Sequence, residues 1–488
     1  MLVKSASTSL AEQLAERFAE RIHTRLLAPG TRLPSVRQCA QQQGVSPSTV
    51  VAAYDRLLAQ GLVEALRNRG FFVRNRAVVL VNKAPDDIKK IATEGADASV
   101  SHKPGFDAQH VPVNATALIR GMFHGQGGEP QPGMGAFPPD WLQTTFMSVA
   151  VRRFTTVKAL QAFSTHYGEP AGDAGLRQSL SQKLSALAIH ATPQQIITTV
   201  GATHALDIVS RTLLRAGDYV MVEEPGWAIE FARLDALGMR ILPVSRGPEG
   251  PDLAVMARYC ELHAPKLFVS VSVFHNPTGY CLTPGSAHRV LQLANLHQFY
   301  VVEDDTYSHI APEHATRLCA LDGLQRTIYV SGFAKILAPG WRVGFMAAPV
   351  PLVERLLDTK LLTTLTTPAL MEKAFAWCID QGQLRRHAER IRARLNQARG
   401  RSVKLALAAG CTFCAPPAGL FGWVDTGVDT DLLAQRMLDA GYLLAPGALF
   451  HASRTPSTLM RINFATTQDA TFWQVFATAR AAMQGLVT

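Results

Sequence analysis

The chain has 488 residues, with 48 lysines and arginines, 38 aspartates and glutamates, and a formal net charge of +10. Hydrophobic residues make up 47% of it, enough for a sizeable core, and this composition excludes a disordered chain. No segment approaches the ~18 apolar residues of a membrane span, and the first residues lack the pattern of a signal peptide. At about 150 residues per domain, the length allows one small and one large domain, or three domains of average size.

The cysteines indicate a reducing compartment. There are seven, an odd number, and they are spread along the chain, which argues against a disulfide framework. Cys411 and Cys414 form a CxxC pair, but without a second pair or nearby histidines it is weak evidence for zinc. We therefore expect a cytoplasmic protein without a metal site.

The first 75 residues have the pattern of three short helices and a β-hairpin. Apolar residues recur every four positions from Leu10 to Leu26, which is the spacing of one helix face. Three helices followed by a two-stranded ribbon predict a winged helix-turn-helix. The expected elements are helices ending before Pro29-Gly30, Gly44 and Gly61, followed by strands at 62–64 and 71–73.

This module carries residue types that bind DNA. Ten basic residues against five acidic ones place half of the net charge in under a sixth of the chain. The third helix would enter the major groove with its N-terminal hydroxyls leading, and the hairpin arginines would reach a minor groove. The alternative is that the arginines are surface charges and the serines only cap helices. The candidate DNA contacts are Arg32, Ser35, Arg37, Ser46, Ser48, Thr49, Arg67 and Arg69.

The stretch PGTRLPSVRQCAQQQGVSPSTVVAAYDRLLAQGLVEALRNRGFFV closely resembles the DNA-binding domain of GntR-type bacterial regulators. The resemblance implies a winged helix-turn-helix over residues 1–75 and double-stranded operator DNA as a partner. Residues 76–120 are polar and lack periodicity, so we expect a partly flexible linker; the alternative is an ordered arm along the large domain. Residues 121–488 would then form that large domain.

From about residue 125, short β-rich runs alternate with helical stretches, which predicts an α/β domain with a mostly parallel sheet. The runs are IITTV, YVMVEE, LFVSVS, FYVVEDD and TIYVSG. Ligands bind at the carboxyl ends of the strands in such sheets, and polar or aromatic residues lie at or just after the end of each run. In chain order these residues are Ala202 and Thr203 at a helix start that suits a phosphate, then Trp227, Asn276, Asp304 with Tyr307, and Lys335 with Arg342.

Together these residue types meet the needs of pyridoxal phosphate. A lysine supplies an amine for a Schiff base with the aldehyde, a carboxylate keeps the ring nitrogen protonated, and an arginine holds the phosphate. An aromatic side chain stacks on the ring, while an amide and a phenol bond its oxygen. Each residue alone has an ordinary structural explanation, such as a surface lysine or a core tryptophan. The combination favours the cofactor.

The order and spacing of these residues resemble fold-type I enzymes, the aspartate aminotransferase-like group, from about residue 125 to the end. The resemblance implies that Lys335 forms the Schiff base, that Asp304 pairs with the ring nitrogen, and that Arg461, in MRINF, binds the α-carboxylate of a substrate. The other implied contacts are Asn276 and Tyr307 at the ring oxygen, Trp227 on the ring face, and Ala202, Thr203, Arg342 and, from a partner subunit, Tyr167 at the phosphate.

The sequence departs from that pattern beside the lysine. The group often has a serine three residues before the lysine and another directly before it, where this chain has Gly332 and Ala334. Ser331, one step earlier, is then a candidate hydroxyl for the cofactor. His204 replaces a common glutamine in the phosphate turn, and we expect it on a helix face without a catalytic role.

The two parts together resemble the MocR subfamily of GntR-type regulators. The resemblance implies a homodimeric bacterial transcription regulator that senses pyridoxal phosphate or an amino compound through aldimine chemistry at Lys335. The alternative is a working aminotransferase with an accessory DNA-binding domain, since Lys335, Asp304 and Tyr307 form an intact catalytic set. A third hypothesis is that the large domain serves only as a dimer scaffold.

Overall fold

The computed structural model describes residues 9–23, 27, 30–66, 69–74, 131–337 and 339–484. The chain divides into two compact units, residues 1–124 and 125–488, which are described separately. The linker expected over 76–120 lies outside the described residues, and so does Arg67. In the described part, no helix is both long enough and apolar enough to cross a bilayer.

The first unit is a winged helix-turn-helix, as predicted. Ser46 caps the third helix by accepting a hydrogen bond from the Thr49 N–H at 3.2 Å, and Gly44, with a φ of 64°, ends the second. The core centres on the buried Tyr54, whose hydroxyl donates to the Pro34 carbonyl at 2.9 Å. The elements are α1 (Leu10–His23), α2 (Val36–Gln43), α3 (Pro47–Ala59), β1 (Val63–Leu66) and β2 (Gly70–Val73), and the two strands pair antiparallel.

The second unit is built on a seven-stranded sheet that is mostly parallel, which confirms the predicted fold class. Strand β9 alone in this sheet runs opposite to the other strands; the β4–β5, β4–β6, β6–β7 and β7–β8 pairs are parallel. The sheet order is β3 (Ile196–Thr199), β9 (Gly344–Ala347), β8 (Thr327–Gly332), β7 (Tyr300–Asp304), β6 (Leu267–Ser270), β4 (Tyr219–Glu224) and β5 (Arg240–Ser245).

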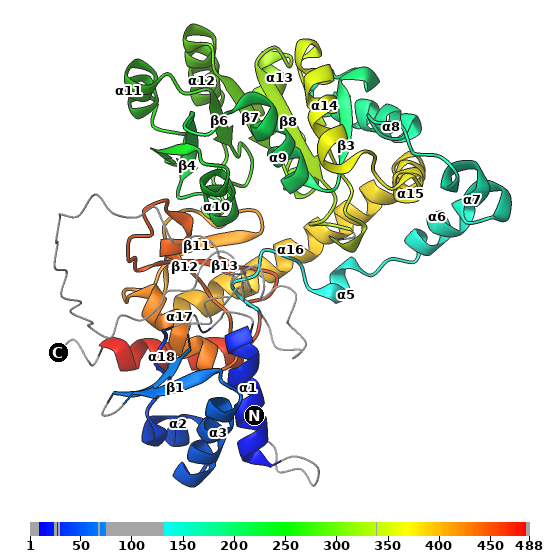
Figure 1. Cartoon of the computed structure of the whole chain (residues 1–488). Coiled ribbons are helices and arrows are strands. Elements are labelled where there is room, and N and C mark those ends of the chain that lie inside the picture. Colours follow the sequence, from blue (N-terminus) through cyan, green and yellow to red (C-terminus); the bar gives the residue numbers. More distant parts are fainter. Residues whose placement is uncertain are drawn as a thin grey trace, which may run out of the picture. The chain divides into compact units, whose positions relative to one another are not determined.

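Helices cover both faces of this sheet (Figure 1). The strands are apolar on both faces, as buried parallel strands are. Val220 and Val222 pack toward one helical layer and Met221 toward the other. The first layer contains α9 (Ala202–Leu213), α10 (Ala228–Ala236) and α14 (Val353–Thr364), and the second contains α11 (Leu253–His263), α12 (Pro284–His297) and α13 (Leu318–Asp322).

A smaller antiparallel sheet completes the second unit. The long helix α16 (Gln383–Ala408) runs past both sheets (Figure 1), and its Ser402 hydroxyl lies 2.6 Å from that of Thr467. The small sheet has the order β10 (Thr412–Phe413), β11 (Phe421–Asp425), β13 (Leu459–Asn463) and β12 (Ala445–Pro446). The other helices are α5 (Pro139–Leu142), α6 (Phe146–Phe154), α7 (Val157–Ser164), α8 (Ala174–Ser185), α15 (Ala369–Asp380), α17 (Thr430–Asp439) and α18 (Ala470–Gln484), with short 3-10 turns at Pro193–Gln195, Ser308–Ile310, Pro339–Trp341, Val350–Leu352 and Gly447–Phe450.

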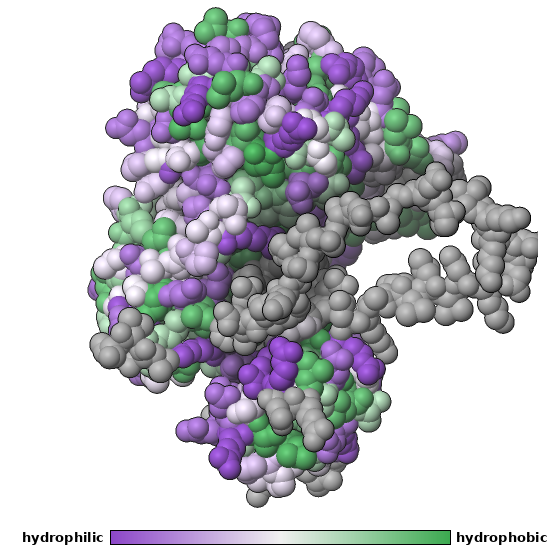
Figure 2. All heavy atoms as spheres, turned by 60° about the vertical axis from the view of Figure 1, so that its left-hand side comes forward, coloured by the Kyte–Doolittle hydropathy of each residue, from purple (hydrophilic) through white to green (hydrophobic). Residues whose placement is uncertain are grey.

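The visible surface of the second unit mixes hydrophilic and hydrophobic residues (Figure 2). Most large apolar side chains are buried, but a few are not. Tyr167 and Leu362 expose 83% and 89% of their surface. Cys411 is buried and Cys414 exposed, on either side of β10, and all seven cysteines are free thiols.

Candidate functional site

The Lys335 amine lies beyond the carboxyl end of β8, in a turn. Its Nζ donates a hydrogen bond to the Gly135 carbonyl at 2.9 Å. The pKa of Lys335 is lowered to about 8, chiefly by burial and also by the nearby guanidinium groups of Arg461 and Arg342, while Asp304 opposes them. A lysine with such a pKa has a substantial neutral fraction near neutral pH, which a nucleophilic amine requires.

Asp304 ends the adjacent strand β7. Burial raises the pKa of its carboxyl to about 6, and hydrogen bonds from Thr306, including its N–H at 3.0 Å, hold the pKa down only in part. The nearby charges of Glu230 and Asp305 also raise this pKa. A buried carboxyl of this kind favours a cationic partner, because a positive charge would stabilise its ionised form.

Arg461 lies in the middle of β13, where the small sheet faces these strand ends. Its Nη1 donates to the Asn276 Oδ1 at 2.9 Å, and its Nη2 donates to the Gly133 carbonyl at 2.6 Å. The rings of Phe421 and Phe450 lie 4.5 and 5.1 Å from its guanidinium carbon. Burial lowers its pKa to about 10, so Arg461 stays charged at neutral pH. Its buried Nε has no hydrogen-bond partner in the described structure.

Asn276 and Tyr307 border the same space. The turn that carries Asn276 is fixed by His275, whose carbonyl accepts from the Gly279 N–H at 2.6 Å and whose Nδ1 lies 2.9 Å from the Thr278 hydroxyl. Tyr307 is buried, which raises the pKa of its phenol, so it remains a neutral hydrogen-bond donor. The structure therefore brings an amide and a phenol together with the lysine, the carboxyl and the arginine.

The turn after β3 has the geometry of an anion-binding turn, and we call it the cradle. Gly201, with a φ of 87°, precedes α9, whose N–H groups at Ala202 and Thr203 lie in the first turn and have no acceptor within the helix. Arg342 lies across this turn and donates from Nη2 to the Val200 carbonyl at 2.9 Å. The positive φ favours glycine at position 201, and a Cβ there would lie 2.4 Å from that nitrogen, so the Arg342 side chain would have to shift.

His204 holds this cradle in place. Its Nδ1 accepts from the Val200 N–H at 3.1 Å, and its Nε2 lies 2.9 Å from the Thr364 hydroxyl at the end of α14. Burial lowers the pKa of His204, which keeps the ring neutral and preserves the Nδ1 acceptor. The histidine thus links the phosphate turn to α14.

Other predicted cofactor residues are placed differently. The hydroxyl of Ser331 donates to the Asp305 carbonyl at 2.9 Å inside the sheet, so the structure does not bring it into this group. Thr203 is exposed on the first turn of α9, and Trp227 is half-buried at the start of α10. Tyr167 is largely exposed, as expected for a residue that reaches a second subunit.

In the first unit, the predicted hydroxyl residues lie at the N-terminal ends of helices. Ser35 accepts from the Gln38 N–H at 3.3 Å, and the hydroxyls of Ser48 and Thr49 each lie 2.8 Å from that of Ser46. These contacts match the capping role that the sequence left open. The three serines are exposed, and Thr49 is half-buried.

The predicted arginines that the structure describes, Arg32, Arg37 and Arg69, are exposed. The guanidinium of Arg69 lies over the Phe72 ring, 5.9 Å from its centroid. Arg32 lies against the wing at Gly70, where a Cβ would be 3.3 Å from its Nε. Arg37 extends from α2, so all three are accessible to phosphates.

A segment that sequence reasoning missed closes one side of the lysine site. We call residues 131–137 the strap. Its Gly133 and Gly135 carbonyls contact Arg461 and Lys335, and Asn463 fixes it by donating to the Met134 and Ala136 carbonyls at 2.9 and 2.7 Å. Because the main chain makes these contacts, no side-chain type in the sequence predicts them. The PGMG sequence indicates only that the chain turns here.

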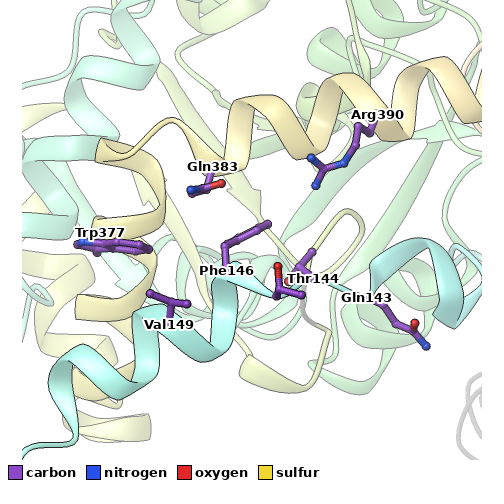
Figure 3. A pocket seen from close by; sticks show the side chains of 8 residues that line it. Gln143, Thr144, Phe146, Val149, Trp377, Gln383 and Arg390 are labelled. Carbon is purple, nitrogen blue, oxygen red and sulfur yellow. The ribbon is translucent and has the colours of Figure 1, made fainter.

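A separate cavity of about 550 Å³ lies among α6, α15 and α16 (Figure 3). Arg390 on its wall places Nη2 3.3 Å from the His387 Nδ1, and the His387 Nε2 lies 2.5 Å from the Ile336 carbonyl. The cavity is lined by Gln143, Thr144, Thr145, Phe146, Val149, Trp377, Gln383 and Arg390. None of these lining residues is among the predicted cofactor contacts.

Comparison with known protein families gives a match for each of the two units. Residues 146–476 match the model of aminotransferase class I and II. The chain belongs to this family. Residues 10–73 match the model of bacterial regulatory proteins of the gntR family, so the chain joins a GntR-type helix-turn-helix domain to an aminotransferase domain.

Two relatives that match this chain over most of their length are named as regulators. The uncharacterized HTH-type transcriptional regulator YisV of Bacillus subtilis is 27% identical over 91% of this chain and 90% of its own. The probable rhizopine catabolism regulatory protein MocR of Rhizobium meliloti is 28% identical over 80% of this chain and 76% of its own. Among solved structures, the α-aminoadipate aminotransferase LysN of Thermus thermophilus, complexed with N-(5'-phosphopyridoxyl)-L-leucine, superposes with a TM-score of 0.69 at 24% identity, over 76% of this chain and 95% of its own.

Proposed function

We propose that this class I and II aminotransferase family member is a transcription regulator that binds pyridoxal phosphate at Lys335 and responds to an amino compound there. The observation that carries the proposal is the buried Lys335 amine, whose pKa the charges of Asp304, Arg461 and Arg342 all affect, in a chain that also has a GntR-type domain. A DNA-binding regulator of this kind would act in the cytoplasm.

The residues present fit the cofactor. The turn at Gly201 and the Arg342 guanidinium offer an anion cradle that a single Cβ would fill. Within the described residues the buried Arg461 Nε has no partner, so its N–H can donate to a carboxylate. When bound, pyridoxal phosphate supplies an aldehyde that condenses with primary amines and a pyridine ring that withdraws electrons.

Each side chain has one task in this proposal. Lys335 supplies the amine, and Asp304 holds a proton on the ring nitrogen. Asn276 and Tyr307 donate to the ring oxygen, while Arg461 holds the carboxylate of an amino acid. The phosphate is assigned to the N–H groups of Ala202 and Thr203 and to Arg342, with Trp227 on the ring face.

We further propose a homodimer that covers the surface around Tyr167. A Cβ at the next residue, Gly168, would lie 3.7 Å from the Thr367 carbonyl, so Tyr167 is adjacent to the segment that follows α14. Leu362, 89% exposed, lies in the last turn of α14, and His204 links that turn to the phosphate cradle. A second copy on this apolar surface would place its own tyrosine beside the phosphate, and the linker proposed over 76–120 would connect each subunit to its DNA-binding unit.

DNA binding and cofactor occupancy together test this function. Operator DNA is selected from a random-sequence pool by the full chain, and its affinity is measured for cofactor-loaded protein during titration with amino acids and amines. We expect at least one compound to change both the visible absorption and the DNA affinity. If no compound that alters the visible absorption also changes the DNA affinity, the proposed sensor role is contradicted.

A working aminotransferase is the second candidate, and the grouping of Lys335, Asp304 and Tyr307 favours it. Lys335 could move a proton at the α-carbon of a bound amino acid, because its pKa of about 8 lies near neutral pH. Steady-state turnover with paired amino and keto acids tests it. Fast and complete conversion would favour the enzyme, and reaction without turnover would favour the sensor.

A further inference from the structure

Lys360, on α14, is a buried lysine to which the proposed function gives no task. None of its surface is exposed, and its Nζ donates to the Pro170 carbonyl at 2.6 Å, the one hydrogen bond of this amine within the described residues. Its pKa is lowered to about 8, chiefly by burial and also by Arg177, while Glu372 opposes them. Burying an amine costs free energy, so an apolar side chain would serve better if packing were the only task.

The carbonyl that Lys360 holds belongs to residues 167–173, which we call the tyrosine loop. Tyr167 begins this loop and exposes 83% of its surface. The other fixed points of the loop are the Ala171 carbonyl, which accepts from the Thr198 N–H at 2.9 Å, the Gly172 carbonyl, which accepts from the Arg177 Nε at 3.1 Å, and the Asp173 N–H, which donates to the Glu372 Oε2 at 2.7 Å. Of these contacts, the one from Lys360 is nearest to Tyr167 in sequence.

The helix that carries Lys360 also contacts the phosphate cradle. The Thr364 hydroxyl, in the last turn of α14, lies 2.9 Å from the Nε2 of His204, whose Nδ1 holds the turn after β3. Thr364 follows Lys360 by four residues, so the two side chains lie on the same face of the helix. One face of α14 therefore contacts both the cradle of its own chain and the loop that carries Tyr167.

We propose that Lys360 is a positioning residue that acts across the dimer, because it holds the tyrosine loop so that Tyr167 can reach the cofactor phosphate in the partner subunit. The inference rests on the proposed function and on the homodimer proposed with it. Since the hydrogen bond of the amine goes to the loop, loss of the amine should weaken the partner's cofactor site rather than its own. Helix α14 would then link each phosphate site to the tyrosine that serves the other.

The first arm of the test uses no cofactor. Amide hydrogen exchange is measured over the tyrosine loop in the full chain and in Lys360→Met, which has a similar shape but no donor. We expect the loop amides to exchange severalfold faster in the variant, because the Pro170 carbonyl is released. The matched control is Lys183→Met, which removes a half-buried lysine of α8 that has no hydrogen bond to the loop in the described structure. The control should leave loop exchange unchanged.

The second arm uses mixed dimers of two differently tagged chains, purified through both tags. One chain carries Lys335→Ala, so only the other chain can hold the cofactor covalently. Lys360→Met is placed on the Lys335→Ala chain in one dimer (the trans dimer) and on the cofactor-holding chain in the other (the cis dimer). The dissociation constant of pyridoxal phosphate at the single covalent site is read from the visible absorption.

We expect the trans dimer to bind the cofactor about threefold to tenfold more weakly than the parent mixed dimer, the effect of one hydrogen bond. The cis dimer should match the parent, because the tyrosine that serves its covalent site comes from a chain with Lys360 intact. Tyr167→Phe on the Lys335→Ala chain should produce the same one-sided loss. If Lys360→Met does not fold, Lys360→Gln replaces it, since its amide ends one bond short of the Nζ position.

Three results would overturn the role of Lys360. They are unchanged loop exchange in a folded variant, a loss in the cis dimer that equals or exceeds the loss in the trans dimer, and a chain that remains a monomer. A parent mixed dimer that never acquires the visible absorption of lysine-bound cofactor contradicts the proposed function instead. The cofactor-free arm still shows whether Lys360 holds the tyrosine loop.

Discussion

The Asn276 Oδ1 accepts a hydrogen bond from the Arg461 Nη1 at 2.9 Å, although the two residues are 185 positions apart in sequence. One lies in the turn after β6 and the other in β13, so this bond joins the large sheet to the small one. It also fixes the guanidinium that we assign to a ligand carboxylate.

Replacement of Asn276 should weaken amino acid binding. Asn276→Ala leaves two buried nitrogens of Arg461 without partners, and a hydrogen bond to a charged group contributes about 1.5–3 kcal/mol. We expect the apparent affinity for an amino acid, read from the visible absorption, to fall by about tenfold to a hundredfold. Asn396→Ala is the matched control, because Asn396 accepts from Arg399 at 2.6 Å on the exposed face of α16. Equal losses in both variants would refute this role.

The rate of cofactor attachment should depend on pH through Lys335. Its pKa is lowered to about 8, so the protonated form predominates below pH 8 and the neutral amine above it. Since only the neutral amine attacks an aldehyde, the rate at which apo-protein gains visible absorption should rise about tenfold per pH unit below 8 and level off above. A rate that does not change between pH 6 and 8, about two units, would show that this amine is not the one that reacts.

Loss of the Asp304 charge should weaken cofactor retention. Asp304→Asn preserves the shape of the side chain but cannot pair with a protonated ring nitrogen. We expect the dissociation constant of pyridoxal phosphate, measured by equilibrium dialysis, to rise by about tenfold to a hundredfold, the effect of one charge-assisted hydrogen bond. The wild-type protein should weaken in the same way as pH falls through about 6, where this carboxyl becomes neutral. If the variant retains pyridoxal phosphate as well as the wild-type protein does, Asp304 does not contact the cofactor.

Introducing a charge on the proposed dimer surface should prevent dimer formation. Leu362→Glu places a carboxylate where a second copy would pack, and desolvating an unpaired charge is costly. We expect a monomer by sedimentation, together with weaker cofactor retention because Tyr167 of the partner subunit is withdrawn. Leu296→Glu is the control, since Leu296 is 73% exposed on α12 in the opposite helical layer. A Leu362→Glu protein that remains dimeric would exclude this surface.

DNA affinity should depend on Arg37. The exposed guanidinium on α2 is expected to contact a phosphate, so Arg37→Ala should lower affinity and reduce the slope of log affinity against log salt by about one. Arg56→Ala serves as the control, because Arg56 forms an ion pair with Glu12 at 2.8 Å within the same unit. A salt slope that Arg37→Ala leaves unchanged would mean that the side chain touches no phosphate.

Sequence reasoning located the lysine site because each chemical group lies at or just after the end of a recognisable apolar run. Asp304 and Lys335 lie at or beyond the ends of β7 and β8, which pair parallel to each other, so their convergence follows from topology. Strand β5 was not predicted, since it begins with an exposed Arg240 and contains Pro243. Strand β9 runs antiparallel, which no alternation of apolar runs reveals.

Two other features depend on distant contacts. The strap reaches Arg461 across 328 positions, and it does so through glycine carbonyls, which have no side-chain signature. The Ser331 hydroxyl was expected near the cofactor, but it meets the Asp305 carbonyl at 2.9 Å because residues of a strand alternate in direction. Position along the chain indicates which residues approach the site, whereas the strand register determines where each side chain points.

The central claim is that Lys335 holds the cofactor covalently, and reductive trapping tests it most directly. The full chain is loaded with pyridoxal phosphate, reduced with borohydride, digested and examined by mass spectrometry. The account predicts a phosphopyridoxyl group on Lys335 and none in Lys335→Ala. A group found on another lysine, or an unmodified Lys335 in protein that has bound the cofactor, would contradict it.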